Sequence, residues 1–142
     1  MIEFLGLPKL LKGKEDVLSG WLNGCAKGHK SRIKNLVYHF VDDAEIIRMN
    51  IKHLQHDYAT DIITFGYSEG KKISGDIYIG YETVMENAKD LSVSLMEEMC
   101  RVVAHGMLHL IGFDDHSNEE KALMRNEEEK CLILRPKILR SN

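Results

Sequence analysis

The chain has 142 residues, of which 44% are hydrophobic and 29% are charged, and its formal net charge is −3. This length suits a domain with its own hydrophobic core, so we interpret residues 1–142 as a single domain. No apolar run approaches the roughly 20 residues that a membrane-spanning helix needs. The slightly acidic balance gives no overall basic surface for nucleic acid, and we expect neither DNA nor a membrane as a partner.

The N-terminal segment and the cysteines indicate the cellular compartment. Residues 1–16 are too short and too charged for a secretory signal, which favours a cytoplasmic location. Cys25, Cys100 and Cys131 are dispersed and form no CxxC pair. This argues against a disulfide framework and a cysteine zinc site, and we expect three small buried residues.

Charge is distributed unevenly along the chain. Residues 1–40 carry seven Lys or Arg against three Asp or Glu, whereas residues 41–100 carry five against twelve. The basic residues of the first part and of the C-terminal end include Lys27, Lys30, Arg32, Lys34, Arg135, Lys137 and Arg140. On charge alone they are interpreted as a solvated surface, and the alternative is a local phosphate-binding face.

The first half of the chain mixes strand and helix patterns. In chain order it predicts a strand at 2–5, a helix at 14–27, a strand at 35–41 and a helix from 42 to about 54. Asp42 and Glu45 form a capping-box pattern at the start of the second helix.

The second half predicts two strands and three helices. The strands are at 61–68 and 74–82 and are joined by a loop at 69–71; helices follow at 81–89, 94–111 and about 117–134. Gly112 is placed to end the middle helix, and Ser117 with Glu120 is a second capping-box signal. Since the order lacks a steady βαβα alternation, we expect the α+β class, with a small mixed β-sheet packed against several helices.

The stretch HGMLHLIGFDDH, residues 105–116, carries the strongest chemical signal. His105 and His109 stand four apart on a predicted helix, so they project side by side and can hold one metal ion. HxxxH also occurs by chance, but the following glycine and the polar FDDH segment favour a metal site on this central helix and the turn after it. Three protein ligands with an open fourth position are typical of a catalytic zinc.

Gly106 separates this pattern from that of the zinc peptidases. Their HExxH motif has a glutamate at this position, which acts as the general base. Gly106 cannot do so, which disfavours the usual peptide-hydrolysis mechanism, although a metal can still activate its bound water. A glycine in mid-helix costs about 1 kcal/mol relative to alanine, so a packing or functional reason is worth seeking.

Three segments in register resemble the YbeY family of ribosomal-RNA-processing endoribonucleases. They are HGMLHLIGFDDH, HDYATDIITF (56–65) and SGDIYIG (74–80), and the resemblance covers about residues 35–130. It implies an α+β fold with a metal helix on a small sheet. It also implies one Zn²⁺ per chain and a single-strand-directed endoribonuclease that acts with the ribosomal small subunit, in maturation of its RNA and in ribosome quality control.

The third metal ligand is the first departure from the family pattern. The family usually has a histidine ten residues after the first, where this chain has Asp115, and a histidine follows at His116. Motif register favours Asp115, ligand type favours His116, and a carboxylate oxygen is an acceptable zinc ligand. We therefore expect His105, His109 and Asp115 to bind the metal, with His116 as the alternative ligand or a nearby proton carrier.

The second departure is at Leu54, where the resemblance implies an arginine that serves catalysis. Lys52, His53 or His56 could compensate, or the cation could come from elsewhere in the fold. The catalytic detail is therefore open, and the general base is not identified by the sequence.

Other polar and aromatic residues of the motifs have two interpretations each. Thr60 and Asp61 either shape the cleft or form a turn bonded to backbone. Asp76 either orients a ligand histidine through its second nitrogen or is an ordinary turn carboxylate. Tyr67, Tyr78 and Tyr81 could stack on bases, but strand tyrosines more often serve packing.

The sequence as a whole therefore favours a metal-dependent endoribonuclease, with RNA held by basic residues of the first forty positions and the C-terminal tail. One alternative is a metal-dependent hydrolase of another substrate, such as a peptide. The other is a non-catalytic, ribosome-associated RNA-binding module with a structural metal.

Overall fold

The computed structural model describes residues 1–55 and 57–140. Its elements, in chain order, are β1 (Ile2–Leu5), the 3-10 turn η1 (Lys9–Leu11), α1 (Glu15–Gly28), β2 (Arg32–Val41), α2 (Asp43–Leu54), β3 (Ile62–Gly66), β4 (Lys72–Gly80), α3 (Tyr81–Leu91), α4 (Leu95–Ile111), α5 (Asn118–Ile133) and the 3-10 turn η2 (Lys137–Leu139). This content confirms the predicted α+β class.

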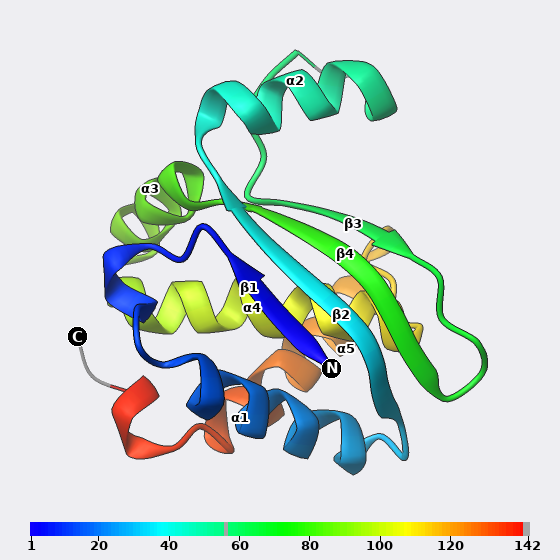
Figure 1. Ribbon diagram of the computed structural model, residues 1–142. Coiled ribbons are helices and arrows are strands. Elements are labelled where there is room, and N and C mark those ends of the chain that lie inside the picture. The colour runs from blue at the N-terminus through cyan, green and yellow to red at the C-terminus, as the bar shows by residue number, and fades with distance from the viewer. Residues whose placement is uncertain (56, 141–142) are drawn as a thin grey trace.

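The strands form one four-stranded mixed sheet in the order β1-β2-β4-β3. β1 and β4 both run parallel to β2, whereas β3 pairs antiparallel with β4. Figure 1 shows α4 crossing behind this sheet, with α1 and α5 on the same side of the molecule and α2 beyond one end of the strands. The sheet therefore has one face covered by helices, and the central helix of that layer is α4.

The core lies between the sheet and α4. Ile73, Ile77 and Ile79 of β4 are almost completely buried, because alternate residues of a strand point to one face. On β2, Tyr38 is equally buried, and its hydroxyl donates to the carbonyl oxygen of Val103 at 2.8 Å. That bond fixes α4 against the middle of the sheet.

Gly106 brings α4 close to the strands. A Cβ atom at this position would come within 2.9 Å of side-chain carbons of Ile62 and Ile77. Since real Cβ atoms do not approach this closely without displacing a neighbour, the mid-helix glycine has a packing reason. It also excludes a glutamate side chain at position 106 in this arrangement.

Helix starts follow the capping signals of the sequence. The side chain of Asp42 accepts a hydrogen bond from the backbone of Glu45. Ser117 and Glu120 form a complete reciprocal capping box at the start of α5. These contacts satisfy backbone N–H groups of the first turn and set where each helix begins, as predicted.

Two strands begin earlier than the sequence predicted. β2 starts at Arg32 rather than at residue 35, and β4 starts at Lys72 rather than at residue 74. Arg32 pairs with Lys72, and the register shifts between Ile33 and Asn35. This irregularity interrupts the alternation of polar and apolar residues, which is why the pattern did not show the first part of β2.

Composition led to two further expectations. Cys25, Cys100 and Cys131 are free and buried, as predicted. Among residues 1–55 and 57–140, no helix combines the length and apolar character needed to cross a membrane.

Candidate metal centre

The last two turns of α4 carry His105 and His109 on one face. Their imidazole rings lie edge to face with centroids 4.6 Å apart, and both side chains are largely buried. α4 ends at Gly112, whose φ of 129° lies in a region that L side chains rarely adopt. The turn sends the chain back across the end of the helix.

Asp115 returns to the two histidines after this turn. Its Oδ2 atom lies 3.4 Å from Nε2 of His105 and 3.6 Å from Nε2 of His109. One ligand atom from each of the three residues lies within 4.8 Å of the others, and among residues 1–55 and 57–140 no other three His, Cys, Asp or Glu side chains form such a group. Two imidazole nitrogens and a carboxylate oxygen are a donor set that fits a divalent metal such as zinc. We call His105, His109 and Asp115 the triad.

His116 lies outside the triad. Its side chain is exposed, and its backbone N–H donates to Oε1 of Glu120 at 3.2 Å, next to the capping box that starts α5. His116 nevertheless lines the cleft beside the triad. Of the two ligand alternatives, the structure brings Asp115 to the histidines, while the proton-carrier role of His116 stays a prediction.

Glu128 of α5 orients His105. Its Oε2 atom lies 2.6 Å from Nδ1 of His105, and its Oε1 atom lies 3.3 Å from NH1 of Arg101. Glu128 is only 5% exposed. A carboxylate on Nδ1 holds the proton there and leaves Nε2 free for a metal, the usual arrangement behind a metal-binding histidine.

The same contacts set the protonation of the histidines. Burial alone would lower the pKa of His105, but the hydrogen bond that it donates to Glu128 and the charges of Glu128 and Asp115 raise it above the usual value. Burial and the neighbouring His105 lower the pKa of His109. His109 is therefore held neutral, the form that binds a metal.

Sequence reasoning missed Glu128, although a signal was present. Met124, Glu128 and Leu132 recur four residues apart on one face of α5, and all three are buried. A glutamate within such an apolar stripe requires a partner, because an unpaired buried carboxylate is costly. Of the two interpretations of Asp76, neither describes the structure: Glu128 is the carboxylate on Nδ1 of His105, and Asp76 lies within β4 beside His39.

The side chain of Asp76 lies on the face of the sheet opposite to α4. It lies 2.9 Å from Nε2 of His39 and accepts a hydrogen bond from the hydroxyl of Tyr67. The ring of Tyr78 stacks on His39 at 4.1 Å, and Tyr81 packs against the hydrophobic core. The packing interpretation therefore describes Tyr78 and Tyr81, while the Tyr67 ring is 57% exposed.

A cleft of about 690 Å³ opens on the triad from the side of β3. It is lined by Leu54, Thr60, Asp61, Ile62, Ile63, Thr64, Phe65, His105, His109, Asp114, Asp115 and His116. This set contains no Lys or Arg among the described residues. Leu54 thus stands in the cleft as a neutral residue, and neither Lys52 nor His53 lines it; His56 lies outside the described residues.

Thr60 and Asp61 combine both predicted roles. The Asp61 carbonyl accepts from the backbone of Gly80 at 2.9 Å, and Thr60 accepts from the buried side chain of Asn50 at 3.1 Å. Both residues also line the cleft. Burial raises the pKa of the Asp61 carboxyl group, while the nearby positive charge of His105 lowers it in part.

Two of the basic residues predicted to hold RNA have internal partners. Arg135 is 9% exposed and donates to the carbonyl oxygens of Leu132 and Leu139, and Arg140 donates to the carbonyl oxygen of Arg135. They close the C-terminal turn, which is a structural role. Within the part of the chain that the structure describes, the other basic residues of that prediction do not line the cleft beside the triad.

Comparisons with known proteins agree on one family. The family model described as Endoribonuclease YbeY matches residues 11–134. A protein of that name from Parabacteroides distasonis is 40% identical over 123 residues, which is 87% of each chain. Another, from Flavobacterium johnsoniae, is 38% identical over 134 residues and covers 94% of this chain and 96% of its own.

A solved structure has the same fold. The solution structure of TM1509 from Thermotoga maritima superposes with a TM-score of 0.70 at 28% sequence identity. The superposition covers 94% of this chain and 88% of the other. The arrangement of α4 on the mixed sheet is therefore shared with an experimentally determined relative.

Proposed function

The chain belongs to the YbeY family of endoribonucleases, and from this premise we propose that it is a metal-dependent endoribonuclease acting on single-stranded RNA. The observation that carries the proposal is the triad of His105, His109 and Asp115 at the head of an open cleft. Three protein ligands leave a coordination position for water or substrate, as in catalytic zinc sites. Zinc is the metal we propose, because imidazole and carboxylate donors suit it.

The proposed substrate is small-subunit ribosomal RNA, acted on during its maturation and in ribosome quality control, in the cytoplasm. The support is the family match over residues 11–134 and the identity to relatives over most of the chain. The cleft adds a physical reason for a single strand, since Phe65 and Ile63 line it beside polar groups and bases have apolar faces.

The residues divide the chemistry among them. A bound divalent ion would polarise a phosphate oxygen and lower the pKa of its water. His105, His109 and Asp115 would hold the ion, and Glu128 keeps the proton of His105 on Nδ1. Asp61, Asp114 and His116 are the other cleft residues that can accept a proton from the attacking oxygen.

The two alternative functions fit the geometry less well. A peptidase of the HExxH type needs a glutamate at position 106, where any Cβ atom would meet Ile62 and Ile77 at 2.9 Å. A structural zinc site is usually closed by four protein ligands, whereas the described residues supply three. Both observations favour an enzyme acting on RNA.

The test is cleavage of matched substrates by protein stripped of metal and then reloaded with zinc. We expect a single-stranded RNA to be cut, a duplex of the same sequence to be cut much more slowly, and a peptide to stay intact. Chelation should abolish cleavage and leave RNA binding. His105→Ala/His109→Ala protein, purified in parallel, measures contaminating ribonuclease; cleavage at the same rate by that variant would refute the proposal.

A further inference from the structure

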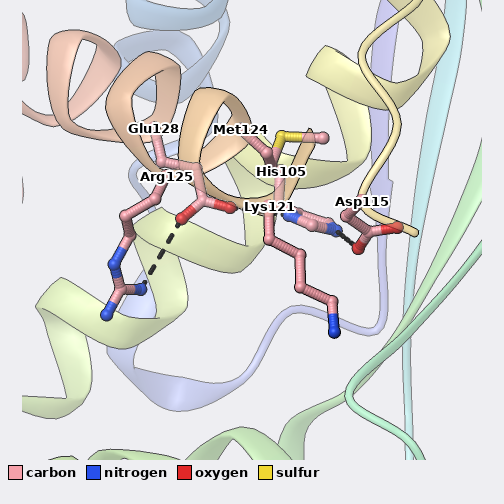
Figure 2. Close-up of a pocket in the computed structure, with 6 residues that line it drawn as sticks. All are labelled: His105, Asp115, Lys121, Met124, Arg125 and Glu128. Carbon is pink, nitrogen blue, oxygen red and sulfur yellow. Dashed lines mark hydrogen bonds and ion pairs between the residues drawn. The ribbon is translucent and has the colours of Figure 1, made fainter. Parts of the chain in front are cut away.

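Among the described residues, His105 lines three cavities, and two of them also contain Asp115. The cleft described above lies on the β3 side, and a second cavity of about 360 Å³ lies on the α5 side. The second is lined by His105, Asp115, Lys121, Met124, Arg125 and Glu128 (Figure 2). His105 and Asp115 line both, so the two cavities adjoin at the triad.

The two cavities differ in charge. The β3 cleft contains three aspartates, Asp61, Asp114 and Asp115, and no Lys or Arg among the described residues. The α5 cavity contains two cations, Lys121 and Arg125, and two carboxylates. Of the carboxylates, Asp115 is shared with the β3 cleft, and Glu128 is paired with His105 and Arg101. Phosphates are repelled by the three aspartates and attracted by the two cations, so the sugar-phosphate backbone has its electrostatic partners on the α5 side.

The position of both cations is fixed by their helix. Lys121 and Arg125 are one turn apart, so they project side by side, and Figure 2 shows both reaching toward the side of α5 where His105 lies. Met124 is buried beside them and fixes the rotation of α5 about its axis. The capping box at Ser117 fixes where α5 begins.

Both cations are available for an anion. Lys121 makes no ion pair with any residue of 1–55 or 57–140, and its side chain is exposed. Arg125 lies 3.8 Å from Oε1 of Glu128, but that carboxylate already contacts His105 and Arg101 at shorter distances. Arg125 is the exposed partner of this long ion pair, and its guanidinium group stays accessible to a phosphate.

We propose that Lys121 and Arg125 form a backbone-phosphate subsite, which holds the phosphate next to the one bound at the triad. This inference rests on the proposed function, because it needs RNA as the ligand. Every nucleotide of a strand carries a phosphate, so a strand with one phosphate at the triad presents its neighbour to the adjacent cavity. The subsite aligns the scissile bond without reading the base, since Lys and Arg contacts to phosphate carry no sequence information.

The experiment measures binding of a 2′-O-methyl single-stranded oligonucleotide, which lacks the 2′-hydroxyl, by fluorescence anisotropy at several salt concentrations. Lys121→Ala, Arg125→Ala and the double variant are compared with wild type. Lys89→Ala is the matched control, because Lys89 is an exposed cation on α3 that lines no cavity around the triad. Lys121→Arg and Arg125→Lys test whether charge alone restores binding.

We expect the double variant to have a shallower salt dependence. Each phosphate contact to a single strand contributes about 0.7 to the slope of log affinity against log salt. Two lost contacts lower the slope by about 1.4, so between about 50 and about 200 mM salt wild type should lose about sevenfold more affinity than the double variant. Lys89→Ala should keep the wild-type slope, and the conservative variants should recover most of it.

Several results would overturn the inference, and they separate it from the proposed function. If wild type cuts RNA but the double variant binds with the same affinity and slope, the subsite is wrong and the endoribonuclease proposal stands. If Lys89→Ala loses as much affinity for the oligonucleotide as either single variant, the loss comes from the lower net charge of the protein and not from a subsite. If wild type neither binds nor cuts RNA, both proposals fail together.

Discussion

At the scale of single residues, His105 is the most constrained side chain of the triad, because it lies between two carboxylates. Glu128 contacts its Nδ1 atom at 2.6 Å and Asp115 faces its Nε2 atom at 3.4 Å. The first contact fixes which nitrogen carries the proton, and the second brings a third ligand to the metal-binding side. A histidine held in this way is preorganised to bind metal before the metal arrives.

Glu128→Gln should therefore weaken metal binding. The glutamine cannot hold the Nδ1 proton as firmly, and we expect the dissociation constant for Zn²⁺ to rise by about 10- to 100-fold, the usual effect of losing such a partner. Competition with a chromophoric chelator measures it. Glu119→Gln, an exposed change in the first turn of the same helix, is the control. An unchanged constant for Glu128→Gln would show that His105 needs no orienting carboxylate.

At the scale of elements, the site depends on how closely α4 lies on the sheet. Gly106 sits between the two histidines and against Ile62 and Ile77. The same close approach places both imidazoles next to the start of β3, where the cleft residues Thr60 and Asp61 lie. Gly106 therefore contributes both to the packing of the core and to the geometry of the candidate metal site.

Gly106→Ala should destabilise the protein in spite of alanine's higher helix propensity. Overpacking of this kind costs about 1–3 kcal/mol. Gly24→Ala in α1 is the matched control, because nothing lies within 4 Å of its Cβ position and it should stabilise by up to about 1 kcal/mol. Urea unfolding measures both. If both substitutions changed the free energy of unfolding in the same direction, the close packing of α4 on the sheet would be contradicted.

The contact between α1 and α5 depends on pH through His29. Its Nε2 atom lies 2.7 Å from Oε1 of Glu127, and its Nδ1 atom lies 3.0 Å from the carbonyl oxygen of Cys25. Burial lowers the pKa of His29, but these two acceptors outweigh burial and raise it above the usual value. The hydrogen bonds from His29 and Lys130 lower the pKa of Glu127, against the effect of its own burial.

His29→Gln should therefore destabilise the protein more at mildly acidic pH than at alkaline pH. The raised pKa of His29 gives stability that is present below about pH 6.5 and is lost as the pH rises through the folded-state pKa. The lowered pKa of Glu127 keeps its charge in that window. We expect a difference of up to about 1 kcal/mol between about pH 5.5 and about pH 8.5, measured by urea unfolding in EDTA. Equal destabilisation by His29→Gln at both pH values would contradict a charged pair between His29 and Glu127.

At the scale of the whole molecule, local patterns of the sequence were sufficient for most of the fold. The capping signals at Asp42 and Ser117 and the helical periodicity from Ser94 to Ile111 act within a few residues, so they can be recognised without the fold. The pairing of β2 with β4 could not be derived in this way, because it joins distant segments and includes an irregularity near Asn35.

The site followed the same division. His105, His109 and Asp115 lie within one short stretch. Helix geometry predicted the approach of the two histidines, and the glycine turn predicted a third ligand from the FDDH segment. The preference for Asp115 over His116 came from the register of the family motif. Glu128 and the cations of the α5 cavity reach the triad only because α5 folds back beside α4. The basic residues predicted to bind RNA from the charge distribution included Arg135, which donates a hydrogen bond to the carbonyl oxygen of Leu132 inside the fold. The charge along a chain does not show which side chains face a common cavity.

We propose that the triad of His105, His109 and Asp115 holds the metal at which RNA is cut. The most direct measurement is the metal content of purified wild type, Asp115→Ala and His116→Ala, with each protein assayed on single-stranded RNA. We predict that Asp115→Ala loses both metal and cleavage, while His116→Ala keeps its metal. Loss of metal from His116→Ala with retention by Asp115→Ala, or a wild type that holds metal and leaves RNA intact, would contradict the account.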